Sequence, residues 1–436
     1  MEGAAKTVIR FGFALALACA VVTRTAAAVG QGASTAGPPA TSQADRDWPS
    51  WRGPNHNGFM ADTDWDPKNP KVLWKVNVGY SHGCISVVGN RAYVPGSFEY
   101  HKGKIYCLDA DTGKEVWSYV IPTAEALKGK NPANWHGGMF STPLIDGQVL
   151  YTASVEGVMV ALDAATGKLI WLKDLRRDEP GFVVPGYGMA TSPLPVGELL
   201  VWNLCSAGMA VDKKTGRTVW KSAFGDAWHS SPVPCKRNGE EGVLLRNGSF
   251  FTILAPTTGK VLLQGEKIGI QYTDPVADGD YLLIGAMWGQ GTGPYALYGT
   301  DKNGPVRVWF QKDLGGAFGS TPVMRNGVVF TFGPAGCLDG KTGAFRWKED
   351  KVSGTGIIVG DKMIVLTSVG GDLIIADASP DAYKEVSRLH VLDNPPDWKK
   401  RSYFEEHCTV PPSFCGGKIF CRNKWGDVVC VDVSKK

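Results

Sequence analysis

Four histidines stand a few residues before short apolar stretches of the sequence: His82, His136, His229 and His407. Imidazole groups that met at one centre could bind a metal ion or move protons. Their spacing argues against a common centre, because His136 lies seven residues before Pro143 whereas His229 lies three residues before Pro232. We therefore expect polar residues of a channel or a turn at these positions, and no metal site.

Aromatic residues are the second group that could recognise a ligand. They gather in the segments that connect the apolar stretches: Trp135, Tyr187, Trp228, Trp288 and Phe318. Flat aromatic faces at an open surface suit a protein, peptide or glycan partner. Trp and Tyr also pack between sheets, so binding and core packing are both open for these residues.

A repeated phrase indicates the fold that must position these candidates. An Asp, a turn containing Gly and a Trp eight residues after the Asp recur along the chain: Asp109 and Trp117, Asp163 and Trp171, Asp212 and Trp220, Asp301 and Trp309, Asp339 and Trp347. Two further copies lack the Trp and carry Leu263 and Glu385 at its position. The Asp can bind turn amides, the Gly can adopt positive φ, and the Trp offers a large flat face to a neighbour.

The two ends of the chain supply the halves of one more copy. Asp432 has no chain left to provide its Trp, whereas Trp74 has no Asp before it. The mean spacing from Asp109 to Asp432 is about 46 residues, which is typical of a four-stranded propeller blade. The sequence thus predicts an all-β, eight-bladed β-propeller of four-stranded antiparallel blades, closed by N- and C-terminal strands that share one blade.

The phrase Asp163-Ala-Ala-Thr-Gly-Lys-Leu-Ile-Trp171 resembles the tryptophan-docking motif of the PQQ-repeat β-propellers. Runs such as Ser-Thr-Pro143 resemble that family's opening strand, and Trp48-Pro-Ser-Trp51-Arg-Gly-Pro resembles a lead-in common to its small secreted members. The resemblance covers about residues 47–434 and implies the propeller fold. The family includes pyrroloquinoline quinone (PQQ) dehydrogenases and non-catalytic scaffolds, such as the propeller lipoprotein of the outer-membrane β-barrel assembly machine.

The catalytic set of the quinoprotein alcohol dehydrogenases is not recognisable in this chain. Those enzymes carry two adjacent cysteines beside the quinone, and a Glu, an Asn and an Asp around calcium. This sequence has no Cys-Cys pair, and no carboxylate maps onto the calcium set. We therefore expect a binding or scaffold protein without a cofactor. A minimal oxidoreductase that uses PQQ with calcium is the alternative.

Composition and the first residues bear on location and partners. The formal charge is +4 at pH 7 without a block of five or six like charges, which argues against nucleic acid. Lys6 and Arg10 precede an apolar run, and small residues follow it, as in a secretory signal peptide cleaved near Ala28. We expect a signal peptide over 1–28, a flexible linker over 29–46 and the propeller over 47–436. The mature protein would be a monomer without a transmembrane segment, in the periplasm, the cell envelope or outside the cell.

An exported protein reaches an oxidising compartment, in which its cysteines could form disulfides. Cys107, Cys337 and Cys430 each lie two residues before the Asp of a repeat, and we expect them to be small buried core residues. Three others, Cys408, Cys415 and Cys421, are not spaced as zinc ligands are, and a local disulfide among them is open. Lipidation at Cys19 is a further alternative.

Overall fold

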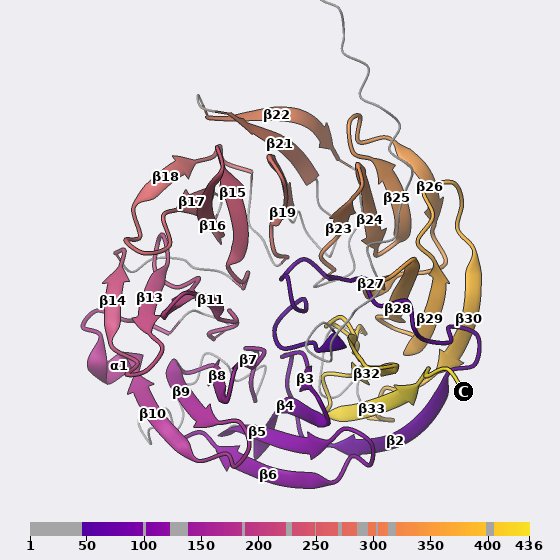
Figure 1. Cartoon of the computed structure of the whole chain (residues 1–436), viewed down its shortest axis with the longest axis horizontal. Helices are drawn as coiled ribbons and strands as arrows, with labels where there is room; N and C mark the ends of the chain where they lie inside the picture. Colours follow the sequence, from indigo (N-terminus) through magenta and orange to yellow (C-terminus); the bar gives the residue numbers. More distant parts are fainter. Residues whose placement is uncertain are drawn as a thin grey trace, which may run out of the picture. The chain divides into compact units, whose positions relative to one another are not determined.

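The protein forms eight β-sheets arranged as a ring around a central axis (Figure 1). The structure is a computed structural model that describes residues 46–98, 102–122, 138–184, 188–223, 229–248, 250–268, 273–285, 295–301, 304–312, 320–397 and 405–436. Seven sheets are antiparallel meanders of four strands consecutive in the chain, one of them with an added fifth strand, and the eighth joins the two ends of the chain. The predicted eight-bladed propeller is confirmed.

The sheets are named blades A to H in the chain order of their innermost strands. Blade A contains β3 (Ser86–Val88), β4 (Arg91–Phe98), β5 (Lys102–Asp109) and β6 (Glu115–Val120). Blade B contains β7 (Leu144–Asp146), β8 (Val149–Ala153), β9 (Val158–Asp163) and β10 (Leu169–Asp174), and the short helix α1 (Leu175–Asp178) follows it. Blade C contains β11 (Leu194–Val196), β12 (Leu199–Trp202), β13 (Met209–Asp212) and β14 (Thr218–Lys221). Blade D contains β15 (Val233–Arg237), β16 (Glu240–Asn247), β17 (Phe250–Leu254) and β18 (Val261–Gln264).

The second half of the ring has the same order. Blade E contains β19 (Val276–Asp278), β20 (Tyr281–Gly285), β21 (Tyr295–Asp301) and β22 (Gly304–Gln311). Blade F contains β23 (Val323–Arg325), β24 (Val328–Phe332), β25 (Ala335–Asp339) and β26 (Phe345–Glu349). Blade G contains β27 (Gly354–Val359), β28 (Lys362–Thr367), β29 (Asp372–Asp377) and β30 (Glu385–His390), with β1 (Phe59–Met60) parallel to β27. Blade H contains β31 (Ser413–Cys415), β32 (Lys418–Arg422), β33 (Asp427–Asp432) and β2 (Lys71–Asn77).

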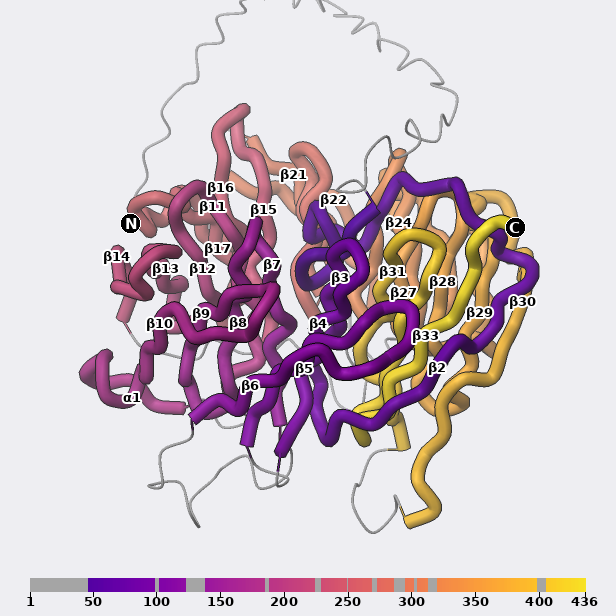
Figure 2. Tube along the Cα trace, turned by 60° about the horizontal axis from the view of Figure 1, so that its bottom comes forward, coloured from indigo at the N-terminus to yellow at the C-terminus, as the bar shows by residue number. Residues whose placement is uncertain are grey.

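Blade H closes the ring because its outer strand comes from the other end of the chain. Strand β2 lies beside β33 in Figure 2. The two strands pair antiparallel, and their register places Trp74 opposite Cys430. The closure predicted from Trp74 and Asp432 is therefore confirmed. In each blade the first strand lies nearest the axis and the outermost strand lies at the rim, as Figure 1 shows for β7 and β10.

Tryptophans on the outer strands tie each blade to the next at six of the eight junctions formed by the described residues. The indole Nε1–H donates to a backbone carbonyl in the turn of the following blade: Trp74 to Ala110 (3.0 Å), Trp117 to Ala164 (3.1 Å), Trp171 to Lys213 (2.8 Å), Trp220 to Pro256 (2.9 Å), Trp309 to Gly340 (2.9 Å) and Trp347 to Ser379 (2.8 Å). The junctions D–E and G–H lack this bond. Leu263 stands in place of the Trp at D–E, as the sequence predicts. At G–H the prediction of Glu385 is wrong: the turn after Asp377 is two residues longer, so that Ser387 lies opposite Ile375 at the Trp position.

The repeated turn shapes the surface on which each Trp ring lies. Asp163 accepts hydrogen bonds from the backbone amide of Thr166 at 2.8 Å and from its hydroxyl at 2.6 Å. Gly167 follows with φ of 70°, and an added Cβ there would lie 2.5 Å from the Trp117 ring. Glycine is therefore needed at this position for two reasons: it adopts the positive φ, and it leaves room for the close approach of the indole ring.

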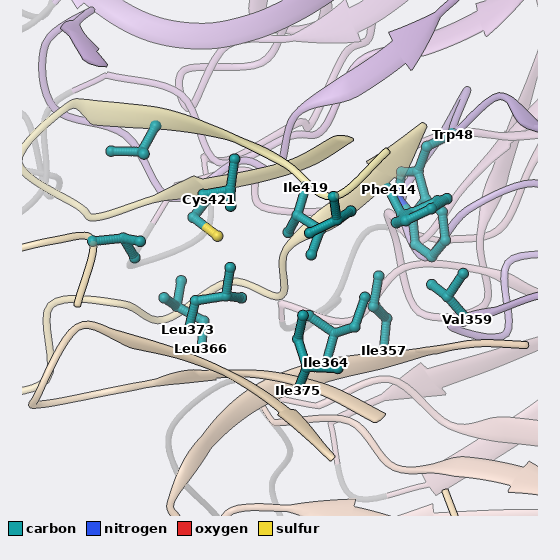
Figure 3. Packing of buried hydrophobic residues seen from close by; sticks show 14 of the residues in the cluster. Trp48, Ile357, Val359, Ile364, Leu366, Leu373, Ile375, Phe414, Ile419 and Cys421 are labelled. Atoms are coloured by element: carbon teal, nitrogen blue, oxygen red, sulfur yellow. The ribbon is translucent and has the colours of Figure 1, made fainter. Parts of the chain in front are cut away.

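The apolar core is divided into clusters between neighbouring blades. Figure 3 shows the cluster between blades G and H, where Ile364 and Ile375 of blade G face Ile419 and Phe414 of blade H. Trp48, from the N-terminal part of the described chain, lies beside Phe414 in the same cluster. Each blade is thus buried on both faces, which explains why its strands are apolar without alternation.

The nine cysteines within the described residues are all free and buried. Cys107, Cys337 and Cys430 lie in the core clusters, as their position in the repeat predicts. The local disulfide considered for Cys408, Cys415 and Cys421 is not formed. The predicted signal peptide and almost all of the linker lie outside the described residues, and so does Cys19. No helix among the described residues is long and apolar enough to cross a membrane.

We expect Gly167→Ala to destabilise the fold more than Gly147→Ala. Both glycines have positive φ, but nothing lies within 4 Å of a Cβ at position 147. Gly147→Ala therefore carries only the backbone cost of about 1 kcal/mol, whereas Gly167→Ala adds about 1–3 kcal/mol of overpacking against Trp117. Urea denaturation followed by circular dichroism measures the difference, and equal denaturation midpoints for the two variants would contradict the docking role of this turn.

Candidate functional site

A chain of hydrogen bonds around the axis links the starts of the inner strands. Five residues supply a side-chain oxygen to the backbone amide of the preceding blade, and we call them the hydroxyl belt: Thr142, Ser192, Ser231, Asp274 and Thr321. The bonds run from Cys84 N to Thr142 Oγ1 (2.9 Å), Thr142 N to Ser192 Oγ (2.9 Å), Ser192 N to Ser231 Oγ (3.0 Å), Ser231 N to Asp274 Oδ1 (2.6 Å) and Asp274 N to Thr321 Oγ1 (3.2 Å).

The belt has a local sequence signal that the repeat analysis missed. Each of its five members stands directly before a proline, as in Thr142-Pro143 and Asp274-Pro275. Proline restricts the preceding residue to extended backbone and itself has no amide to donate. The residue before it is thus placed with its own amide free to reach across to the next blade.

Asp274 is the one acidic member of the belt, and it also holds a second partner. Its Oδ1 accepts the Ser231 amide, and its Oδ2 accepts the indole N–H of Trp51. Burial raises the pKa of the Asp274 carboxyl, and the nearby Arg52 guanidinium opposes that shift. A carboxyl group thus stands where the other members of the belt carry a hydroxyl.

Trp51 belongs to a segment, residues 46–67, that we call the lead-in. It crosses the axis of the ring as the indigo trace at the centre of Figure 1. Trp48 bridges to Val87 of blade A, and the Pro49 carbonyl accepts the Ile145 amide of blade B at 2.8 Å. The segment then reaches blade G, where β1 lies along β27.

Arg52 anchors the middle of the lead-in inside the ring. Its side chain is buried, and Nη2 donates to the carbonyls of Asn57 (2.8 Å) and Pro322 (2.7 Å). Burial lowers the pKa of the guanidinium to about 10, so that Arg52 stays charged at neutral pH. The space beside it, bounded by Trp51, Thr321 and Thr355, has no room for a water-sized sphere. The lead-in therefore fills the axis at the level of the belt.

Of the four candidate histidines, His82 lies in a polar and aromatic cluster at the end of the ring from which the inner strands start. Its Nε2 lies 3.0 Å from the Tyr80 hydroxyl, and its Nδ1 lies 2.8 Å from Thr409 Oγ1. The ring meets Phe140 edge to face with centroids 5.0 Å apart. His82 is thus held in one orientation by neighbours from three blades.

The other histidines occupy different surroundings. His407 is buried, which lowers the pKa of its imidazole, and its backbone amide donates to the Ser368 carbonyl at 2.9 Å. His229 is half-buried beside the start of blade D. Within the described parts of the chain, no group of three or more His, Cys, Asp or Glu side chains could hold a metal ion. The remaining candidates lie outside the described residues: Trp135, His136, Tyr187, Trp228, Trp288 and Phe318.

Two aromatic residues that the sequence analysis did not select extend the surroundings of His82. Tyr80 meets Trp425 edge to face at 5.8 Å, and the Lys424 ammonium lies 5.0 Å from the Trp425 ring centre. Burial lowers the pKa of Lys424 to about 8. We call Tyr80, His82, Phe140, Thr409 and Trp425 the mouth cluster. It combines aromatic faces with hydroxyl and imidazole groups, which suits recognition of a partly polar ligand.

Comparisons with known proteins agree with this architecture. A family model described as outer membrane protein assembly factor BamB matches residues 63–233 and 125–266. BamB of Moranella endobia is 22% identical over 343 residues, 72% of this chain and 80% of that protein. Tetrathionate hydrolase of Acidithiobacillus ferrooxidans is 26% identical over 234 residues, 50% of this chain and 44% of that protein. The chain spans less than half the length of the first curated relatives it matches.

Solved structures share the fold at low identity. Quinohemoprotein alcohol dehydrogenase from Comamonas testosteroni has a TM-score of 0.62 and 13% identity, over 90% of this chain and 81% of that chain. Eight four-stranded blades, locked by tryptophans on glycine turns, define a propeller of the PQQ-repeat type. Residues 63–266 are similar to the BamB family model, and the chain as a whole has the fold of the PQQ-repeat β-propellers.

We expect Asp274 to make stability depend on pH. Its folded-state pKa lies above the unfolded value of about 3.9, so the folded protein binds the proton more tightly. The stabilisation from this group is complete below pH 3.9 and is lost as the pH rises through the folded-state pKa. Asp274→Asn removes the titration, so wild-type melting temperature minus variant melting temperature should fall as the pH rises above the unfolded value of about 3.9. A difference that grows as the pH rises would contradict the raised pKa.

Proposed function

We propose that the chain is an extracytoplasmic binding or scaffold protein built on the BamB-like propeller, and that it acts as a monomer without a redox cofactor. The observation that supports this most directly is the lead-in across the axis. Arg52 and Trp51 occupy the centre at the level of the belt, and the space beside Arg52 is smaller than a water molecule. A quinone needs a pocket of several hundred Å³, with polar groups arranged around it.

The mouth cluster is the surface that we propose for recognition. Tyr80 and Phe140 are almost buried, whereas His82 and Trp425 are half-buried and reach solvent. A rigid aromatic surface with polar groups loses little side-chain entropy when a partner binds. The proposed partner is a protein, peptide or glycan. The nearly balanced charge of the chain supports a partner other than nucleic acid.

A minimal quinoprotein oxidoreductase that uses PQQ with calcium is the second candidate. It is favoured by the likeness to the quinohemoprotein alcohol dehydrogenase, which covers 90% of this chain. In the described residues, no cluster of acidic, His or Cys side chains supports a calcium site. We rank this function second because no residue of the chain is identified that would hold the quinone.

Titration of the purified protein with PQQ, with and without calcium, separates the two functions. We expect the absorbance spectrum of the quinone to stay that of the free compound, and alcohols and sugars not to be oxidised. A saturable spectral shift that needs calcium, together with substrate-dependent reduction of an electron acceptor, would establish the oxidoreductase instead.

Export is tested by the mass of the mature protein. Cleavage near Ala28 should remove the basic and apolar leader, so that the mature chain begins within the Ala-rich segment that follows the apolar run. Intact-mass measurement of protein recovered from a periplasmic extract gives the first residue directly. Recovery of the uncleaved chain in the cytoplasm alone would contradict an extracytoplasmic role.

A further inference from the structure

Two of the eight junctions between blades lack a docking tryptophan, and the tryptophans of the lead-in lie at those two junctions. Leu263 replaces the Trp at D–E, and Ser387 replaces it at G–H. We infer that the lead-in is a staple, whose Trp48, Trp51 and Trp65 supply the locking that these two junctions lack. This inference does not depend on the proposed function.

At the D–E junction the lead-in acts through Trp51. Its indole N–H donates to Asp274 Oδ2, while Asp274 Oδ1 accepts the Ser231 amide of blade D. One carboxylate thus joins blade D, blade E and the lead-in. A hydroxyl has a single oxygen atom, whereas a carboxylate accepts with two, and this explains why the belt changes from Ser or Thr to Asp at this blade.

At the G–H junction the lead-in contributes two large rings to the core. Trp48 and Trp65 are both buried in the cluster that blades G and H share, and the Trp65 ring lies 5.3 Å from that of Phe414. Backbone bonds fix the crossing as well, because the Asp66 amide donates to the Val433 carbonyl of blade H at 2.6 Å. On the side of blade G, Ser387 Oγ donates to the Pro67 carbonyl at 2.6 Å.

The lead-in contacts at the other junctions are of a different kind. The hydrogen bonds to blades A and B come from backbone groups of Trp48 and Pro49 and from the Asp47 carboxylate, which accepts the Gly89 amide at 2.8 Å. The bond to blade F comes from the Arg52 side chain. The indole contacts are therefore concentrated where the rim lacks its own. A force or partner that displaced the lead-in would loosen the junctions D–E and G–H first, and would divide the ring into blades E to G and blades H to D.

Amide hydrogen exchange on the full chain tests the staple. Trp51→Phe keeps an aromatic ring but removes the donor to Asp274, so we expect exchange in β17 and β20, which border the D–E junction, to rise about ten- to a hundredfold. Exchange in β5 and β8, which border the A–B junction, should change little. Trp65→Ala should raise exchange in β28 and β32, which border the G–H junction, and leave β17 and β20 unchanged.

Trp117→Phe is the matched control, because it removes the same indole donor from a rim dock at A–B. It should raise exchange in β5 and β8 and spare the D–E junction. Asp274→Asn provides a second variant at D–E that keeps the side-chain volume, and it should raise exchange at the same strands as Trp51→Phe. An even increase around the whole ring in these variants, or unchanged exchange at D–E in both Trp51→Phe and Asp274→Asn, would overturn the staple.

Discussion

Closing a ring of twisted sheets requires every blade to hold the next at one fixed angle, and the indole-to-turn bond supplies that constraint. Each docking Trp donates its indole N–H to a backbone carbonyl of the next blade, and its ring packs against the glycine in the turn of that blade. The Asp at the start of the turn holds the loop in the shape that offers both contacts. The apolar clusters between blades depend on this angle, because their side chains interdigitate only at a fixed separation.

The hydroxyl belt provides the corresponding constraint near the axis. Its bonds satisfy backbone amides that would otherwise be buried without partners, at a cost of about 1–3 kcal/mol each. The tryptophan bonds hold the outer strand of a blade against the next blade, and the belt bonds hold its inner strand. Where the rim bond is missing at D–E, the belt is reinforced by Asp274 and by Trp51 of the lead-in.

The position of the lead-in bears on function, because the lead-in occupies the central space in which a propeller could hold a ligand. The lead-in fills the axis at the level of the belt, and the mouth cluster lies at the end of the ring from which the inner strands start. The three candidate histidines that lie among the described residues, His82, His229 and His407, are not brought together in one site. His82 is held by Tyr80 and Thr409, whereas His407 is buried against the turn that contains Ser368.

The sequence by itself determined the number of blades, their four strands and the closure of the ring. These follow from the Asp, Gly and Trp of each repeat, whose roles are set by local turn geometry and recur along the chain. The docking partners of Trp117 and Trp171 could be anticipated for the same reason. The sequence also identified His82 as a candidate. It did not reveal the contact between Tyr80 and Trp425 beside His82, because Tyr80 and Trp425 are 345 positions apart in the chain.

Only the tertiary structure decided the path of the lead-in and the composition of the belt. Residues 46–67 have no periodic pattern, so nothing in their order shows that Trp51 meets Asp274 or that Trp65 meets Phe414. Each belt bond joins a backbone amide of one blade to a side-chain oxygen of the next blade. Which residues pair depends on how each blade is rotated relative to its neighbour around the axis. Such contacts depend on the separation of segments in space, which a local pattern of residue types does not encode.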